Sequence, residues 1–147
     1  MKIAYIILAH KLPKQLVRLV HKLNTDKSDF FIHIDKKTND KIFSEIAEAL
    51  TQLENIHFLK RHKSEWGVFG IVRATLEGIR EVLTQETRYD YVILITGQDY
   101  PIKSSRQIQK VLQENAGKSF IEFFALPSKR WEGENGGMDR LTHRYFT

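Results

Sequence analysis

Hydrophobic and polar positions along the chain follow two alternating patterns. One is a short, continuous β-favouring run, which is typical of a strand buried on both faces of a sheet. Such runs lie at residues 2–9, 30–35, 55–59, 91–96 and 119–124. The other is an apolar residue at every third or fourth position, which is typical of a helix with one buried face. This second pattern follows each of the first four runs, so strands and helices are expected to alternate.

Four helices are expected, near residues 13–23, 40–53, 66–83 and 104–116. Pro13 suits the first turn of a helix. Ser104 and Gln107 have the spacing of a capping box, and Gly117 is a typical residue at a helix end. The third helix is expected to turn its apolar residues toward the core. These residues are Val68, Phe69, Val72, Leu76, Ile79 and Leu83.

Alternating strands and helices predict the α/β class, with a mostly parallel sheet flanked by helices. Sheets of this kind bind ligands beyond the carboxyl ends of their strands. Three of those ends carry polar residues, namely His10, Asp35 and the sequence Gly97-Gln98-Asp99. The 147 residues, of which 41% are hydrophobic, fit one globular domain, expected at residues 1–126. Residues 127–147 are Gly-rich and polar without a periodic segment, and indicate an incomplete region, so the fold is expected to be truncated at its carboxyl end.

The charge balance and the absence of cysteine narrow the function classes. Lys and Arg outnumber Asp and Glu by 23 to 18, and the net charge of +5 favours nucleic acid, a membrane surface or a phosphorylated ligand as partner. The absence of Cys excludes a disulfide-stabilised secreted domain, a thiolate metal site and a Cys nucleophile. The sequence contains neither a P-loop nor a Gly-x-Gly-x-x-Gly fingerprint. Its longest apolar run, residues 3–9, is too short to cross a bilayer.

Several polar groups allow two interpretations from the residues alone. The first helix carries a basic stripe formed by Lys11, Lys14, Arg18 and Lys22. This stripe is either a solvated helix face or an anion-binding face. The basic residues 60–63 form either a surface loop or a contact to a phosphate. His10, His33 and Asp35 are either metal ligands or hydrogen-bonded core residues. Asp35 is also either an acceptor for a base or ribose, or a helix cap.

Residues 95–103 are the most informative segment, because Gly97 allows a ligand to approach the backbone, although an ordinary turn uses the same residues. Residues 97–104, Gly-Gln-Asp-Tyr-Pro-Ile-Lys-Ser, resemble the hallmark of the core-2/I-branching glycosyltransferases, a family that includes the peptide O-xylosyltransferases. The resemblance extends to residues 5–10, residues 32–37 and Trp66-Gly67. These segments match the family in order and spacing across most of the chain.

The resemblance implies a GT-A-like (Rossmann-like) fold. It also implies inverting, metal-independent transfer of N-acetylglucosamine or xylose from a UDP-sugar donor to a glycan acceptor, without a cofactor. The implied donor-binding residues are Ala9, His10, Asp35, Trp66, Gly97, Gln98 and Asp99. Glu122, Arg130 and Trp131 fall at acceptor-binding positions. The family's general base falls beyond Thr147, so this chain is expected to be the donor-binding part, without an assigned catalytic residue and of doubtful activity alone.

Two other functions stay open at this point. One is a non-catalytic UDP-sugar-binding module, which would bind UDP without turnover. The other is a basic binder of anionic surfaces or nucleic acid, whose binding would fall steeply with salt and ignore uridine. No nucleic-acid partner is expected, because the basic patches lack interleaved aromatic residues. A cytoplasmic location, with peripheral membrane contact through the basic face, is expected.

Overall fold

The computed structural model describes residues 1–64, 69–131 and 133–142. The chain divides into two compact units, Met1–Ala116 and Gly117–Thr147. This division reflects contacts between residues, and the expected functional boundary at residue 126 stays a prediction. No helix in the described part of the chain is long and apolar enough to cross a membrane.

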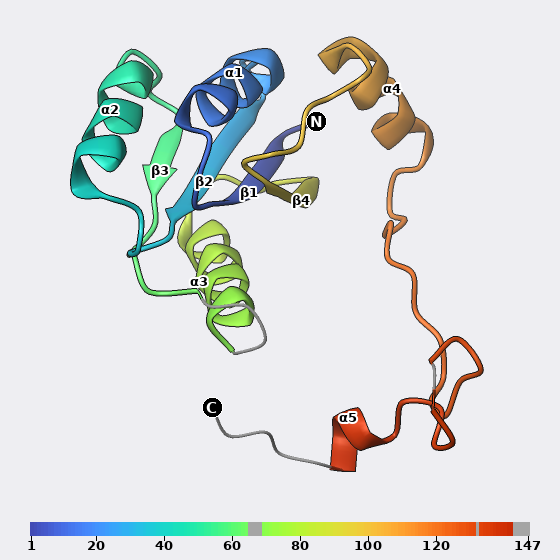
Figure 1. The fold of residues 1–147 in the computed structure, drawn as a ribbon. Coiled ribbons are helices and arrows are strands. Elements are labelled where there is room, and N and C mark those ends of the chain that lie inside the picture. Colours follow the sequence, from blue (N-terminus) through green and yellow to red (C-terminus); the bar gives the residue numbers. More distant parts are fainter. Residues whose placement is uncertain (65–68, 132, 143–147) are drawn as a thin grey trace. The chain divides into compact units, whose positions relative to one another are not determined.

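The first unit is built on a four-stranded, all-parallel sheet in the order β3-β2-β1-β4 (Figure 1). Its strands are β1 (Ile3–Ala9), β2 (Ser28–Ile34), β3 (Ile56–Phe58) and β4 (Tyr91–Thr96). Parallel neighbours need long crossover connections, which here contain helices α1 (Pro13–Leu23), α2 (Asp40–Leu50) and α3 (Gly70–Thr84). The predicted α/β class with a parallel, helix-flanked sheet is therefore confirmed, and it is consistent with a GT-A-like fold.

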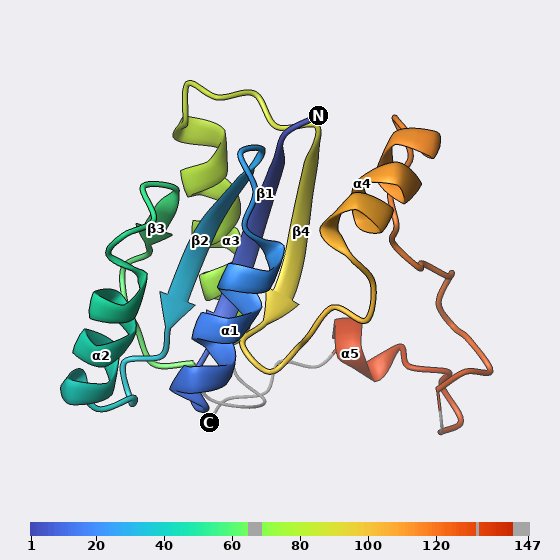
Figure 2. The ribbon, with the colours of Figure 1, turned by 90° about the horizontal axis from the view of Figure 1, so that it is seen from above.

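The helices cover the two faces of this sheet unequally (Figure 2). α1, α2 and α4 (Ser105–Glu114) contribute to the core on one face, and α3 contributes to the core on the other. Tyr5 of the central strand β1 faces the first core, and its neighbour Ile6 faces the second. Because β1 is covered on both faces, its sequence is a continuous apolar run.

The beginnings of α1 and α4 carry the residues from which the sequence predicted them. Pro13 is the first residue of α1, as expected. Ser104 and Gln107 form the predicted capping box, in which each side chain accepts a hydrogen bond from the backbone N–H of the other residue. Gly117 lies beyond α4 with a φ of +80°, a conformation that favours glycine. These local signals therefore fix where α1 and α4 begin.

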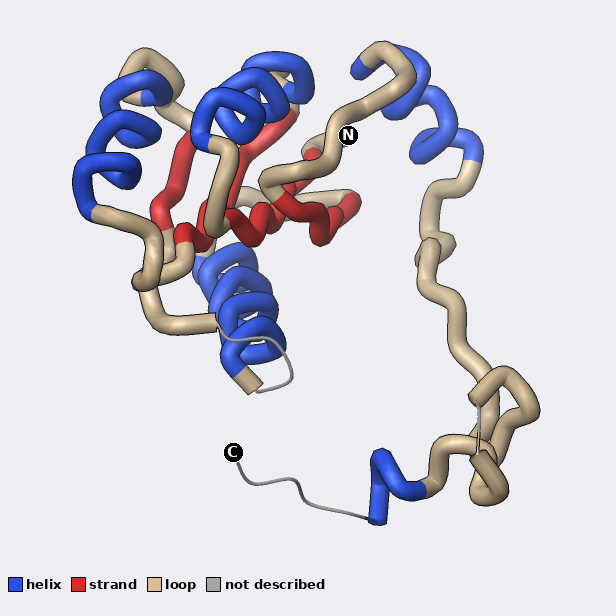
Figure 3. The backbone as a smooth tube through the Cα atoms, in the orientation of Figure 1, coloured by secondary structure: helices blue, strands red, loops and turns tan. Residues whose placement is uncertain are grey.

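The fifth strand expected at residues 119–124 is wrong. The structure assigns no strand to this segment, which is drawn as a loop between α4 and α5 (Asp139–Thr142) (Figure 3). A strand needs backbone hydrogen bonds to a neighbouring strand, and residues 119–124 form no such pairing within the described ranges. The β-favouring composition of residues 119–124 was therefore not enough to make them a strand.

The expected inward face of the third helix is also wrong. Phe69, Leu76 and Leu83 are 64%, 52% and 77% exposed, whereas the buried residues of α3 are Ala74, Gly78 and Val82. The reason is the close packing of α3 on β1, since a Cβ atom at Gly78 would lie only 2.6 Å from Ile6 Cγ2. Small residues allow this approach and large ones do not. Residues 66–68, where the helix was expected to begin, lie outside the described ranges.

Candidate functional site

A cleft of about 420 Å³ lies at the carboxyl ends of β1, β2 and β4. Four of the predicted donor-binding residues line it, namely Ala9, His10, Asp35 and Gln98. The remaining lining residues are Leu8, His33, Lys37, Thr38, Ser64, Ile71 and Thr96. Parallel strands bring their carboxyl ends to one edge of the sheet, so residues separated by some 90 positions in sequence meet here. Trp66, which was also predicted, lies outside the described residues.

Asp35 connects two segments that border the cleft. Its side chain is buried, with one oxygen accepting a hydrogen bond from the Lys37 backbone N–H at 2.8 Å and the other from that of Ser64 at 3.0 Å. The cap of α2 is instead Asn39, whose side chain accepts from the Lys41 N–H. Asp35 is therefore not the helix cap, and each carboxylate oxygen keeps acceptor capacity for a ligand.

Gly97 and Asp99 lie in the loop after β4 and do not line the cleft. Gly97 is buried, and a Cβ atom there would lie 2.8 Å from the Cβ of Ala9. Asp99 accepts a hydrogen bond from the Thr96 backbone N–H through its own carboxylate at 2.6 Å. These two residues therefore shape the turn that places Gln98 at the cleft. Their predicted direct contact with a donor stays a prediction.

Arg61 anchors the loop after β2 and was not singled out by the sequence. Its guanidinium donates hydrogen bonds to the backbone carbonyls of Ile34, Asp35 and Thr38, and it lies 4.7 Å from the Phe43 ring centroid. It also forms an ion pair with Asp40 at 2.7 Å. Arg61 therefore stabilises the segment that bears Asp35 and Lys37. Its position in a run of basic residues gave no signal of this inward role.

His33 forms part of the cleft wall as a neutral side chain. It is 1% exposed, and burial, together with the charge of His62, lowers its pKa to about 4. Its Nε2 accepts a hydrogen bond from the His62 backbone N–H at 3.3 Å. His10, His33 and Asp35 all line the cleft, but across residues 1–64, 69–131 and 133–142 no three His, Asp or Glu side chains form a metal-binding group.

The three predicted acceptor-binding residues lie close together within the second unit. Arg130 forms an ion pair with Glu122 and lies 4.8 Å from the ring centroid of Phe124. Phe124 in turn packs near Trp131, with ring centroids 6.4 Å apart. Glu122 and Arg130 keep 75% and 59% of their side chains exposed, so both remain accessible to a polar ligand. Their role in acceptor binding stays a prediction.

Comparison with known proteins identifies the family. The model of the core-2/I-branching enzyme family matches residues 3–144. The chain belongs to this family. Family membership confirms the resemblance drawn from residues 97–104 and the segments that precede them.

Individual relatives match at modest identity. Xylosyltransferase 2 of Rattus norvegicus is 27% identical over 145 residues, which cover 97% of this chain and 17% of the relative. The human β-1,3-galactosyl-O-glycosyl-glycoprotein β-1,6-N-acetylglucosaminyltransferase is 26% identical over 142 residues, or 91% of this chain and 33% of the relative. Xylosyltransferase oxt of Drosophila pseudoobscura pseudoobscura is 23% identical over 128 residues, or 86% of this chain and 14% of the relative. The chain thus spans between one seventh and one third of these relatives.

Proposed function

We propose that this chain is the donor-binding part of an inverting, metal-independent glycosyltransferase. In this proposal the enzyme transfers a sugar, N-acetylglucosamine in preference to xylose, from a UDP-sugar to a glycan acceptor. The observation that carries the proposal is the cleft, where Ala9, His10, Asp35 and Gln98 come together from three strand ends. Membership of a family whose relatives are xylosyl- and N-acetylglucosaminyltransferases supports the same reaction class.

The chemistry of the cleft suits a nucleotide. Leu8, Ala9 and Ile71 supply apolar surface for a base. The Asp35 carboxylate can accept hydrogen bonds from a base N–H or a ribose hydroxyl, and the Lys37 ammonium can approach a diphosphate.

Transfer with inversion needs two further groups. A general base takes the proton of the acceptor hydroxyl as its oxygen attacks the anomeric carbon, and the bond to UDP breaks with charge left on the diphosphate. We assign neither the base nor the group that stabilises the leaving diphosphate to a described residue. Glu122, Arg130 and Trp131 are proposed to contact the acceptor.

Calorimetric titration of the chain with UDP, UDP-N-acetylglucosamine, UDP-xylose and ADP in EDTA tests the proposal. We expect binding that requires uridine and not metal. His10→Ala should weaken UDP binding about tenfold, the effect of losing one hydrogen bond of about 1.4 kcal/mol. His21→Ala, which removes an exposed histidine from α1, should bind UDP like the wild type.

Each other outcome of this titration contradicts part of the proposal. Equal heats from UDP and ADP that vanish at high salt indicate charge attraction only. Binding that disappears in EDTA contradicts metal independence. Binding of UDP together with no measurable transfer of sugar to any glycan acceptor favours the non-catalytic module.

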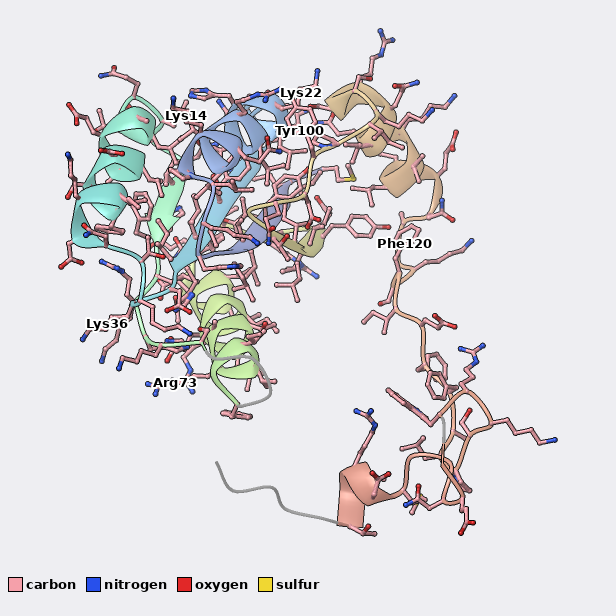
Figure 4. The ribbon with its side chains drawn as sticks, in the orientation of Figure 1. Lys14, Lys22, Lys36, Arg73, Tyr100 and Phe120 are labelled. Carbon is pink, nitrogen blue, oxygen red and sulfur yellow. The ribbon has the colours of Figure 1, made fainter. Side chains whose placement is uncertain are left out.

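We also propose peripheral membrane contact through α1. Lys14, Arg18 and Lys22 are exposed on this helix, and Lys14 and Lys22 can be followed in Figure 4. Lys11, the fourth residue of the predicted stripe, precedes the helix and is also exposed. Co-sedimentation with anionic vesicles should fall as salt screens these charges. Retention that is independent of salt contradicts this contact.

A further inference from the structure

Thr38 links the connections that follow β1 and β2. It is 9% exposed, lies in the connection between β2 and α2, and lines the cleft. Its hydroxyl donates a hydrogen bond to the backbone carbonyl of His10 at 3.1 Å. A carbonyl oxygen only accepts, so the hydroxyl proton of Thr38 is committed to His10 and is not available to a ligand.

The hydrogen bond to His10 lies just beyond the pairing of β1 with β2. That pairing ends with Ala9 opposite Ile34, and the Asp35 N–H donates to the Ala9 carbonyl at 2.8 Å. His10 is the next residue along the chain. Among the described residues, the partner of the His10 carbonyl is a side chain, that of Thr38. The Thr38 hydroxyl therefore continues the link between the two connections where strand pairing stops.

The turn that begins at His10 contains an unfavourable backbone conformation. Leu12 has a φ of +56°, in the left-handed region, which is unfavourable for a residue with a side chain. Its carbonyl accepts from the N–H groups of Gln15 and Leu16, at 2.9 and 3.1 Å, in the first turn of α1. Such a conformation persists only where the surrounding contacts hold it. The Thr38 hydroxyl holds the β1 end of this turn, and α1 holds the other end.

The main chain of Thr38 is itself held at two points. Its N–H donates to the Asp35 carbonyl at 2.9 Å, and its carbonyl accepts from the Arg61 guanidinium at 2.5 Å. Arg61 is held in turn by its ion pair with Asp40. The Thr38 hydroxyl thus starts from a fixed backbone and needs little ordering to reach His10. The connections that follow β1, β2 and β3 are therefore joined through Thr38.

We propose that Thr38 is a positioning residue for the cleft, whose hydroxyl fixes the His10 carbonyl and thereby the turn that carries His10 from β1 to α1. His10 is exposed and lines the cleft, so the position of its side chain depends on this turn. The inference rests on the proposed function only where it concerns UDP, because the turn is a property of the free protein. Without the Thr38 hydroxyl the turn loosens, and UDP has to order it on binding.

Two substitutions at Thr38 separate the hydroxyl from the shape of the side chain. Thr38→Val replaces the hydroxyl with a methyl group and leaves the His10 carbonyl without this partner. Thr38→Ser retains the hydroxyl and removes only the methyl group. Thr51→Val is the matched control, because Thr51 is exposed and lies at the carboxyl end of α2. Urea unfolding of each variant establishes that it is folded.

Hydrogen exchange in the free chain measures the turn. The amides of Gln15 and Leu16 report on it, since both donate to the last carbonyl of the turn. Their protection, compared with that of the Arg73 amide in the first turn of α3, should fall about fivefold in Thr38→Val, the equivalent of one lost hydrogen bond of about 1 kcal/mol. It should change by less than about twofold in Thr38→Ser and Thr51→Val. Unchanged protection in Thr38→Val, or an equal loss in Thr38→Ser, overturns the proposal.

A UDP titration then tests the link to the ligand. If the wild type binds UDP, Thr38→Val should bind it about fivefold more weakly, and Thr38→Ser and Thr51→Val within about twofold of the wild type. Adding Thr38→Val to His10→Ala should weaken binding no further, because Thr38 acts through His10. Full additivity of these two substitutions, or unchanged UDP affinity in Thr38→Val, would overturn the role in the cleft. If the wild type binds no UDP, the proposed function fails, while amide protection still decides whether Thr38 fixes the turn.

Discussion

The two faces of the sheet are built from similarly apolar sequences but are covered very differently. Helices α1, α2 and α4 lie over one face of the sheet (Figure 2). On this face Ile7, Leu16 and Phe30 are all fully buried within a large core. On the face of α3, Val92 and Leu94 of β4 remain 48% and 51% exposed. Within the described residues of the first unit, one helix covers the second face and three cover the first, so in this unit the first face is closed and the second is partly open.

The two faces also differ in the kind of residue that each one buries. The buried side chains of the closed face are hydrophobic apart from Ser28, whose hydroxyl donates to the Leu23 carbonyl of α1. The α3 face holds the buried polar residues His33 and Asp35 near its strand ends, and the contact of the His62 ring with Glu77, in which Nδ1 and Oε2 lie 3.1 Å apart. Asp35 and His33 are tolerated there because both are hydrogen-bonded: Asp35 accepts from the Lys37 and Ser64 N–H groups, and His33 accepts from the His62 N–H. The closed face therefore contributes to stability, whereas the buried polar residues of the cleft, His33 and Asp35, lie on the open face.

Matched leucines should give the largest contrast between the faces. Leu16→Ala should cost about 2–5 kcal/mol of unfolding free energy, because Leu16 is fully buried and its removal leaves a cavity. Leu76→Ala, on the exposed side of α3, should change it by less than about 0.5 kcal/mol. Urea unfolding of the two variants provides the measurement. Equal losses would contradict the description of one closed and one open face.

A pH titration of stability should show the next largest effect. In the unfolded chain His33 is protonated near its usual pKa of 6.5, whereas in the folded protein the pKa of His33 is about 4. Between these values the unfolded state binds more protons, so the free energy of unfolding should fall as pH falls, by up to about 1.4 kcal/mol per pH unit. His33→Gln should show a shallower slope in urea unfolding across this window. An unchanged slope would contradict a buried, neutral His33.

A glycine substitution should produce the smallest effect and test how closely α3 packs. Gly78→Ala gains helix propensity of about 0.5–1 kcal/mol, but its Cβ would meet buried Ile6, and overpacking costs about 1–3 kcal/mol. A net loss of about 1 kcal/mol is expected in urea unfolding. Ile6→Val in the same chain should recover part of that loss by making room. A stabilised Gly78→Ala would show that α3 can move away from β1.

Much of the candidate site was predictable because it depends on where strands end. Ala9, His10, Asp35 and Gln98 follow or finish β-favouring runs, and a parallel sheet brings such residues to one edge. Lys37, Thr38 and Ser64 were missed, since they reach the cleft through loops whose paths depend on distant contacts. Arg61 and the pair of His62 with Glu77 were missed for the same reason, because their partners lie 15 or more positions away.

By itself, the sequence determined the alternation of strands and helices, the α/β class, two helix starts and the family. Each of these depends on local periodicity, local capping chemistry or a linear motif. Only the tertiary structure decided that α3 buries Ala74, Gly78 and Val82 instead of its larger residues, and that residues 119–124 form no strand. The physical reason is common to both: burial and strand pairing require a neighbour, and the pattern of one segment does not specify which surface will face it.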